Sequence, residues 1–102
     1  MRVNVIWVFL VFFSLPVSAH SIFMDCKQEG AEVSCLASFS DGSSAENIAY
    51  EVLSYEDKVL LKGRTDLNSG FKFPVPVNDY YVLLDAGPGH VVDVDMTDIH
   101  TP

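Results

Sequence analysis

The segment that decides the fold is YYVLLDAGPGHVVDVDM, residues 80–96. Two runs rich in β-forming residues, Tyr80 to Asp85 and His90 to Met96, flank the four residues 86–89. A connection this short, with two glycines and a proline, predicts a tight hairpin between two antiparallel strands. This segment therefore predicts that the chain contains antiparallel β-structure.

The same pattern recurs upstream, where short β-type runs alternate with turn residues and no stretch shows sustained helical periodicity. The further strands are predicted at 20–26, 32–39, 48–53, 58–62 and 71–75. Seven strands in about eighty residues predict an all-β fold, a seven-stranded, two-sheet β-sandwich with Greek-key connections. Residues 20–97 form the predicted domain, and 98–102 are predicted to be a flexible tail.

The first nineteen residues have the layout of a cleavable signal peptide. A basic Arg2 precedes an apolar run, which breaks at Pro16 and ends in small residues up to Ala19. The run is shorter than the roughly 20 apolar residues of a membrane-spanning helix, and no later segment is apolar enough to span a bilayer. The sequence thus predicts a secreted, periplasmic protein that starts at His20 and has no membrane span after cleavage.

The mature chain would be small and acidic. It has 83 residues, and the loss of Arg2 takes the formal charge from −8 to −9. Such a balance argues against a nucleic-acid partner, because phosphate binding needs clustered Lys and Arg. The chain has two cysteines, Cys26 and Cys35, which alternation places on apolar faces of the first two strands. In an oxidising compartment this pair predicts a disulfide, with free or metal-bound thiols as the alternative.

Several segments together resemble a known family: Gly63-Arg64-Thr65-Asp66, Phe71-x-Phe73-Pro74, Asp79-Tyr80-Tyr81-Val82 and Asp85-Ala86-Gly87-Pro88-Gly89-His90. They are similar to bacterial periplasmic transthyretin-like (carboxypeptidase-regulatory-like) domains, especially those associated with nickel and cobalt uptake. The resemblance implies a metal-related role in the cell envelope and singles out His90. The chain departs from the family in placing Gly70 one residue late and in lacking a histidine-rich loop.

The candidate metal ligands are His20 and His90. Cleavage after Ala19 would give His20 two nitrogen ligands, its free α-amine and its ring, which suit copper, nickel or cobalt. In many sandwiches the first and last strands run parallel side by side, so the starts of these strands, and the two histidines, are predicted to lie together. The competing interpretation of His90 is a partly exposed residue held by a hydrogen bond.

Other residues are weaker candidates. Asp85 is either an oxygen ligand or a solvated turn residue, and Met24 and Met96 are either copper(I) ligands or core residues. His100 is interpreted as incidental, and Asp93 and Asp95 as surface charge. We expect no catalytic residues, because the sequence contains no nucleophile elbow, phosphate loop or zinc-protease motif.

Two functions follow as expectations. One is a periplasmic transition-metal-binding protein that acts as a carrier or accessory, with a membrane transporter or another envelope protein as a partner. The alternative is a metal-free β-sandwich that presents an edge strand or loop to another envelope protein. The fold alone cannot choose between them.

Overall fold

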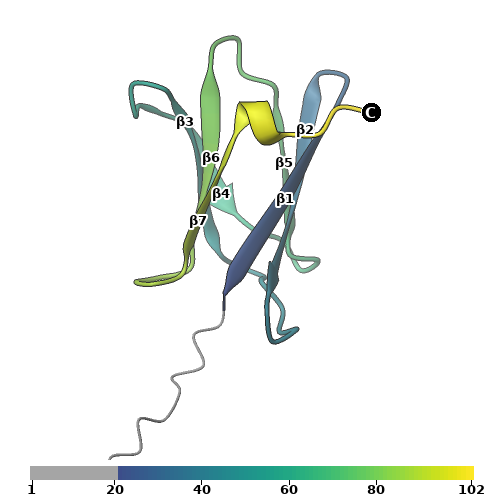
Figure 1. Ribbon diagram of the computed structural model, residues 1–102, viewed down its shortest axis with the longest axis vertical. Helices are drawn as coiled ribbons and strands as arrows, with labels where there is room; N and C mark the ends of the chain where they lie inside the picture. Colours follow the sequence, from purple (N-terminus) through teal and green to yellow (C-terminus); the bar gives the residue numbers. More distant parts are fainter. Residues whose placement is uncertain (1–20) are drawn as a thin grey trace, which may run out of the picture.

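The computed structural model describes residues 21–102, and these residues form two antiparallel sheets (Figure 1). The elements are β1 (Ile22–Glu29), β2 (Glu32–Phe39), β3 (Ala49–Ser54), β4 (Val59–Arg64), β5 (Gly70–Pro74), β6 (Tyr80–Asp85), β7 (Val91–Asp95) and the short 3₁₀ helix η1 (Met96–Asp98). One sheet has the order β1-β2-β5 and the other the order β4-β3-β6-β7. The prediction of an all-β, two-sheet sandwich is confirmed. The signal peptide and His20 lie outside the described residues.

The first hairpin is longer than predicted. Instead of ending at residue 26, β1 continues to Glu29, which pairs with Glu32 of β2. Only Gly30 and Ala31 remain for the turn, and Gly30 has a φ of 63°, a conformation that glycine adopts without strain. The polar residues 27–29 suggested a turn, but an edge strand tolerates them because its outer face meets water.

Cys26 and Cys35 form the predicted disulfide, with an S–S distance of 2.03 Å. They are directly paired residues of β1 and β2, and both are almost fully buried. Their side chains belong to the core between the sheets, as the alternation predicted. The largest fully buried side chains of this core are Leu84, Val33, Val52, Val82 and Cys26. The disulfide thus links two strands of the smaller sheet at the centre of the sandwich.

The chain after η1 is packed, although 98–102 were predicted to be a flexible tail. Ile99 is buried and joins the core. The backbone N–H of Gln28 donates to the carbonyl of His100 at 2.7 Å, and the N–H of His100 donates to the carbonyl of Cys26 at 3.2 Å. His100 thereby makes a parallel bridge to β1. The polar residues around position 99 predicted a solvated segment. Burial of the apolar Ile99 side chain anchors it instead.

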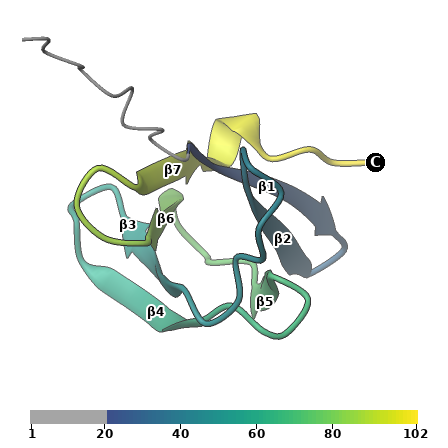
Figure 2. The ribbon, with the colours of Figure 1, turned by 90° about the horizontal axis from the view of Figure 1, so that it is seen from below.

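The two sides of the sandwich differ in how the sheets meet. On one side β1 and β7 lie next to each other and run in the same direction, as both views of the ribbon show (Figures 1 and 2). On the other side β4 and β5 are the outer strands of their sheets. Within residues 21–102, no helix is long and apolar enough to cross a lipid bilayer.

Candidate functional site

Of the two candidate metal ligands, His20 and His90, the described residues contain His90. It lies in the β6–β7 loop directly before β7. Its backbone N–H donates to the carbonyl of Gly87 at 2.9 Å, and its carbonyl accepts from the N–H of Ala86 at 2.9 Å. Gly87 and Gly89 have positive φ values of 111° and 80°, which explains the glycines of this tight loop. The loop therefore holds the backbone of His90 in a fixed place, and its side chain is partly buried.

His90 lines a small hollow of about 220 Å³ together with Phe39, Ser43 and Ala86. The hollow joins the β6–β7 loop to the end of β2 and the segment that follows it. Two of its four lining residues, Phe39 and Ala86, are apolar. We call this end of the sandwich, defined by Ser21, residues 39–43 and His90, the His90 pole.

The start of β1 is fixed at the same pole. The N–H of Ser40 donates to the carbonyl of Ser21 at 2.8 Å, and the N–H of Ser21 donates to the Oγ of Ser40 at 3.0 Å. Ser40 is the neighbour of Phe39, which lines the hollow with His90. In Figure 1 the start of β1 and the β6–β7 loop lie at the lower end of the molecule. Ser21 and His90 thus both adjoin the segment 39–43, whereas the predicted proximity of His20 and His90 stays a prediction because residue 20 lies outside the described residues.

The other predicted candidates lie elsewhere. Asp85 is exposed and accepts a hydrogen bond from the N–H of Gly87 at 2.9 Å, and it is absent from the residues lining the His90 hollow. His100 lies toward the far end of β1, where its Nε2 is 3.6 Å from the Oδ1 of Asp25. Met24 and Met96 are half-buried against the core. Residues 21–102 contain no group of three or more His, Cys, Asp or Glu side chains that could hold a metal ion.

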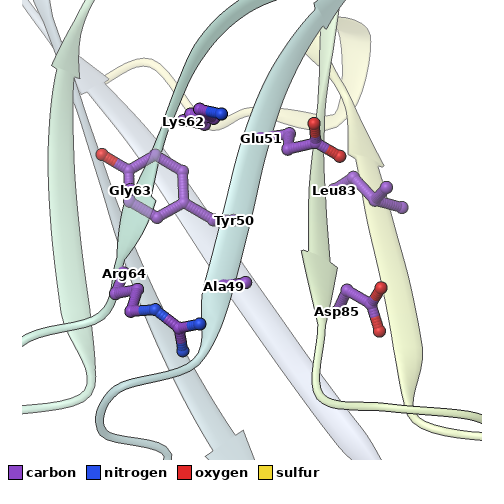
Figure 3. A pocket seen from close by; sticks show the side chains of 8 residues that line it. All are labelled: Ala49, Tyr50, Glu51, Lys62, Gly63, Arg64, Leu83 and Asp85. Carbon is purple, nitrogen blue, oxygen red and sulfur yellow. The ribbon is translucent and has the colours of Figure 1, made fainter.

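A second hollow, of about 520 Å³, lies on the outer face of the larger sheet (Figure 3). Lys62 and Arg64 come from β4, whereas Glu51 and Asp85 come from β3 and β6. The Nη1 of Arg64 donates to the carbonyl of Asn47 at 2.9 Å. No local sequence pattern marks this surface. Its residues come from three strands, and only the pairing of those strands brings them together.

A third surface combines acidic side chains with two tyrosines. The Tyr55 hydroxyl donates to Asp95 at 2.8 Å, and the Tyr81 hydroxyl donates to Asp57 at 2.7 Å. The hydrogen bond to Asp95 raises the pKa of Tyr55 to about 12, and the bond to Asp57 raises the pKa of Tyr81. Hydrogen bonds from Thr97 and Tyr55 lower the pKa of Asp95. These bonds tie the β3–β4 turn to β6 and β7, which indicates a structural role.

Comparison with known proteins supports the fold and nothing finer. No family model and no curated protein matches the chain. Among solved structures, it is similar to two structures of native alpha-2-macroglobulin from Escherichia coli, one spanning domains NIE-MG1 and one spanning MG0-NIE-MG1. Both have a TM-score of 0.68 and 13% sequence identity over 76% of this chain, which covers 38% and 25% of those chains. At this identity the likeness places the chain in the class of β-sandwich domains.

Proposed function

We propose that the mature chain is an exported, periplasmic protein that binds a transition-metal ion, copper, nickel or cobalt, and acts as a carrier or accessory. The ligands are the α-amine and ring of His20, freed by cleavage after Ala19, and the imidazole of His90. A membrane transporter or another envelope protein is the proposed recipient. The disulfide between Cys26 and Cys35 is consistent with an oxidising compartment outside the cytoplasm.

The observation that carries this proposal is the attachment of Ser21 to the His90 pole. Ser21 makes two hydrogen bonds with Ser40, one with its backbone N–H and one with its side-chain Oγ, next to the hollow that His90 lines. Residue 20 is covalently bonded to Ser21, and consecutive Cα atoms are about 3.8 Å apart. The new amine would therefore be introduced at the pole that contains a partly buried imidazole.

The chemistry of the donors favours transition metals over calcium or magnesium. An amine and imidazoles are nitrogen ligands, whose affinity for divalent metals rises toward copper, whereas calcium and magnesium prefer oxygen. Because both kinds of nitrogen must lose a proton before they bind, affinity should fall in acid. The chain's formal charge of −8 also raises the concentration of cations near its surface.

The topology and family of the sandwich are also part of this proposal. We assign the sandwich to the seven-stranded Greek-key, transthyretin-like class of periplasmic domains on the segments 63–66, 71–74, 79–82 and 85–90. A solved structure of a relative with a similar hairpin at 85–90 would test this assignment without any measurement of metal binding.

The test is a titration of copper(II) into metal-free mature protein, with nickel(II) and cobalt(II) run in parallel. Mass spectrometry first verifies that the chain begins at His20. We expect His20→Ala and His90→Ala each to weaken binding by about tenfold or more, because each removes a nitrogen ligand. His100→Ala is the matched control, since His100 lies away from the His90 pole, and it should leave the affinity unchanged.

A second variant isolates the amine. An extra methionine before His20 keeps both rings but removes the free amine from residue 20, and it should weaken copper binding as His20→Ala does. Unchanged affinity in His20→Ala, His90→Ala and the methionine-extended protein would refute the metal site. The remaining candidate, a metal-free interaction module, is favoured by an independent feature of β4.

A further inference from the structure

The outer edge of β4 is unpaired, because β4 is the terminal strand of the larger sheet. Its three consecutive apolar residues are unusually exposed for a strand, with Val59 at 44%, Leu60 at 42% and Leu61 at 39%. Leu60 and Leu61 also line a hollow of about 400 Å³ with Ser54, Glu56, Pro74 at the end of β5 and residues 75–78 of the β5–β6 loop. Val77 of that loop is fully exposed. An unpaired strand edge thus adjoins an apolar hollow.

The other edge strands of the two sheets, β1, β5 and β7, are protected. In β1 the edge is bridged by His100, and β7 lies beside β1 (Figures 1 and 2). In β5 there are only five residues, and the last is Pro74, which has no N–H to donate. In the part of the chain that the structure describes, β4 is the edge strand with the longest exposed apolar run, although lysines flank that run and its pairing with β3 shifts register at Val52 and Leu53.

The charge of this edge is opposite to that of the rest of the protein. Residues 21–102 contain five Lys and Arg, and three of them, Lys58, Lys62 and Arg64, lie within 58–64. That stretch contains no Asp or Glu, although the chain has fourteen acidic residues in all. An incoming segment with negative charge would meet a complementary edge, and a positive one would be repelled.

The register of β4 defines the order of side chains that such a segment needs. Leu61 pairs with the buried Val52, so it is on the inner face, whereas Lys62 pairs with Glu51 on the outer face. A strand added beside β4 would place alternate residues next to these two faces. Apolar residues would suit the side of Leu61 and the loop hollow, and acidic residues the side of Lys62 and Arg64.

We propose that the β4 edge binds an extended segment of another protein in which apolar and acidic residues alternate. The main chain of the segment would extend the larger sheet to five strands. A second copy of this chain is a poorer occupant. Pairing β4 with β4 would bring Lys58, Lys62 and Arg64 into one ribbon with the same charges, which is unfavourable. The β7 strand is acidic and apolar, but it already lies alongside β1.

The test uses nitrogen-15-labelled mature protein in EDTA, so that its result is independent of metal binding. Two synthetic nine-residue peptides serve as probes, one alternating valine with aspartate and the other alternating valine with lysine. The aspartate peptide should shift the amide signals of residues 59–64, 75, 77 and 78, with a dissociation constant about tenfold lower than that of the lysine peptide. The preference should shrink as salt is added.

Charge-reversal variants test the complementarity, and circular dichroism must first verify their fold, because Lys62 pairs with Glu51 and Arg64 donates to the carbonyl of Asn47. The Lys62→Glu, Arg64→Glu double variant should reverse the preference between the two peptides. Lys72→Glu, on β5, should leave it unchanged. The proposal is overturned if neither peptide shifts residues 59–64, if both shift them equally, if the signals map to another edge, or if those signals instead respond to protein concentration alone, which would identify a second copy as the occupant.

Discussion

β1 and β4 are both terminal strands of their sheets, but their outer edges are covered to different extents. At β1 the protein covers the edge with its own C-terminal segment through Ile99 and His100. At β4 no described segment performs this role, and three apolar residues stay exposed between basic ones. An unpaired edge is a liability in a sheet protein unless it is protected or used. The β1 edge is thus covered by the chain itself, and the β4 edge is the one to which the proposal assigns binding.

The largest expected effect tests the covalent closure of the β1 side. Replacing both Cys26 and Cys35 by alanine should lower the free energy of unfolding by about 3 kcal/mol, because the disulfide restricts the unfolded chain and its sulfurs fill the core. Urea unfolding of the variant beside the oxidised protein measures this loss. A variant as stable as the parent would mean that the hairpin and core suffice without the crosslink.

The next effect concerns the segment that covers β1. Ile99→Ala should cost about 2 kcal/mol, because it removes most of a buried side chain at the rim of the core. Hydrogen exchange should also speed up at the amide of Gln28, which donates to His100. His100→Ala is the control, since the bridge uses only the backbone of that residue. Equal protection of Gln28 in both variants would contradict the anchoring role of Ile99.

A smaller effect is expected on the β4 side. A Cβ at Gly63 would lie 2.8 Å from the hydroxyl of Tyr50, whose ring stacks on Phe71 with centroids 3.8 Å apart. Gly63→Ala should therefore cost about 1 kcal/mol through displacement of the ring. In the Tyr50→Leu background the same substitution should cost less, and a double-mutant cycle on thermal or urea unfolding measures the difference. Additive costs would show that Tyr50 is not the obstacle.

The smallest effect tests a link between the two sides, the hydrogen bond from Tyr55 in the β3–β4 turn to Asp95 at the end of β7. The bond raises the pKa of Tyr55 to about 12 from its ordinary 10.0. Its stabilising contribution should therefore be complete between the acidic range in which Asp95 titrates and pH 10, and it should be lost as the pH rises toward 12. Tyrosinate absorbance should follow this titration, and Asp95→Ala should return the pKa of Tyr55 toward 10. An unchanged titration in the variant would exclude the bond.

The sequence predicted the fold class from local alternation and turn residues, and it predicted the disulfide from a pair of cysteines in an expected oxidising compartment. The pattern of residues 80–96 predicted the last hairpin, and the parity of Cys26 and Cys35 predicted that both thiols face the core. The end of β1 and the packing of Ile99 and His100 were missed for one reason: polar residues in an edge strand and an isolated apolar residue give no periodic signal. His90 was found as a candidate, but the hollow around it was not.

Local chemistry alone therefore determined that this chain forms strands, where most of its turns fall, which cysteines pair and that its surface is acidic. Tertiary structure decided which edges are covered, since that depends on contacts between residues far apart in the chain, such as His100 with β1 and Ser21 with Ser40. Side-chain alternation repeats every two residues and is encoded along the chain, whereas the neighbours of an edge strand are set by how the two sheets pack.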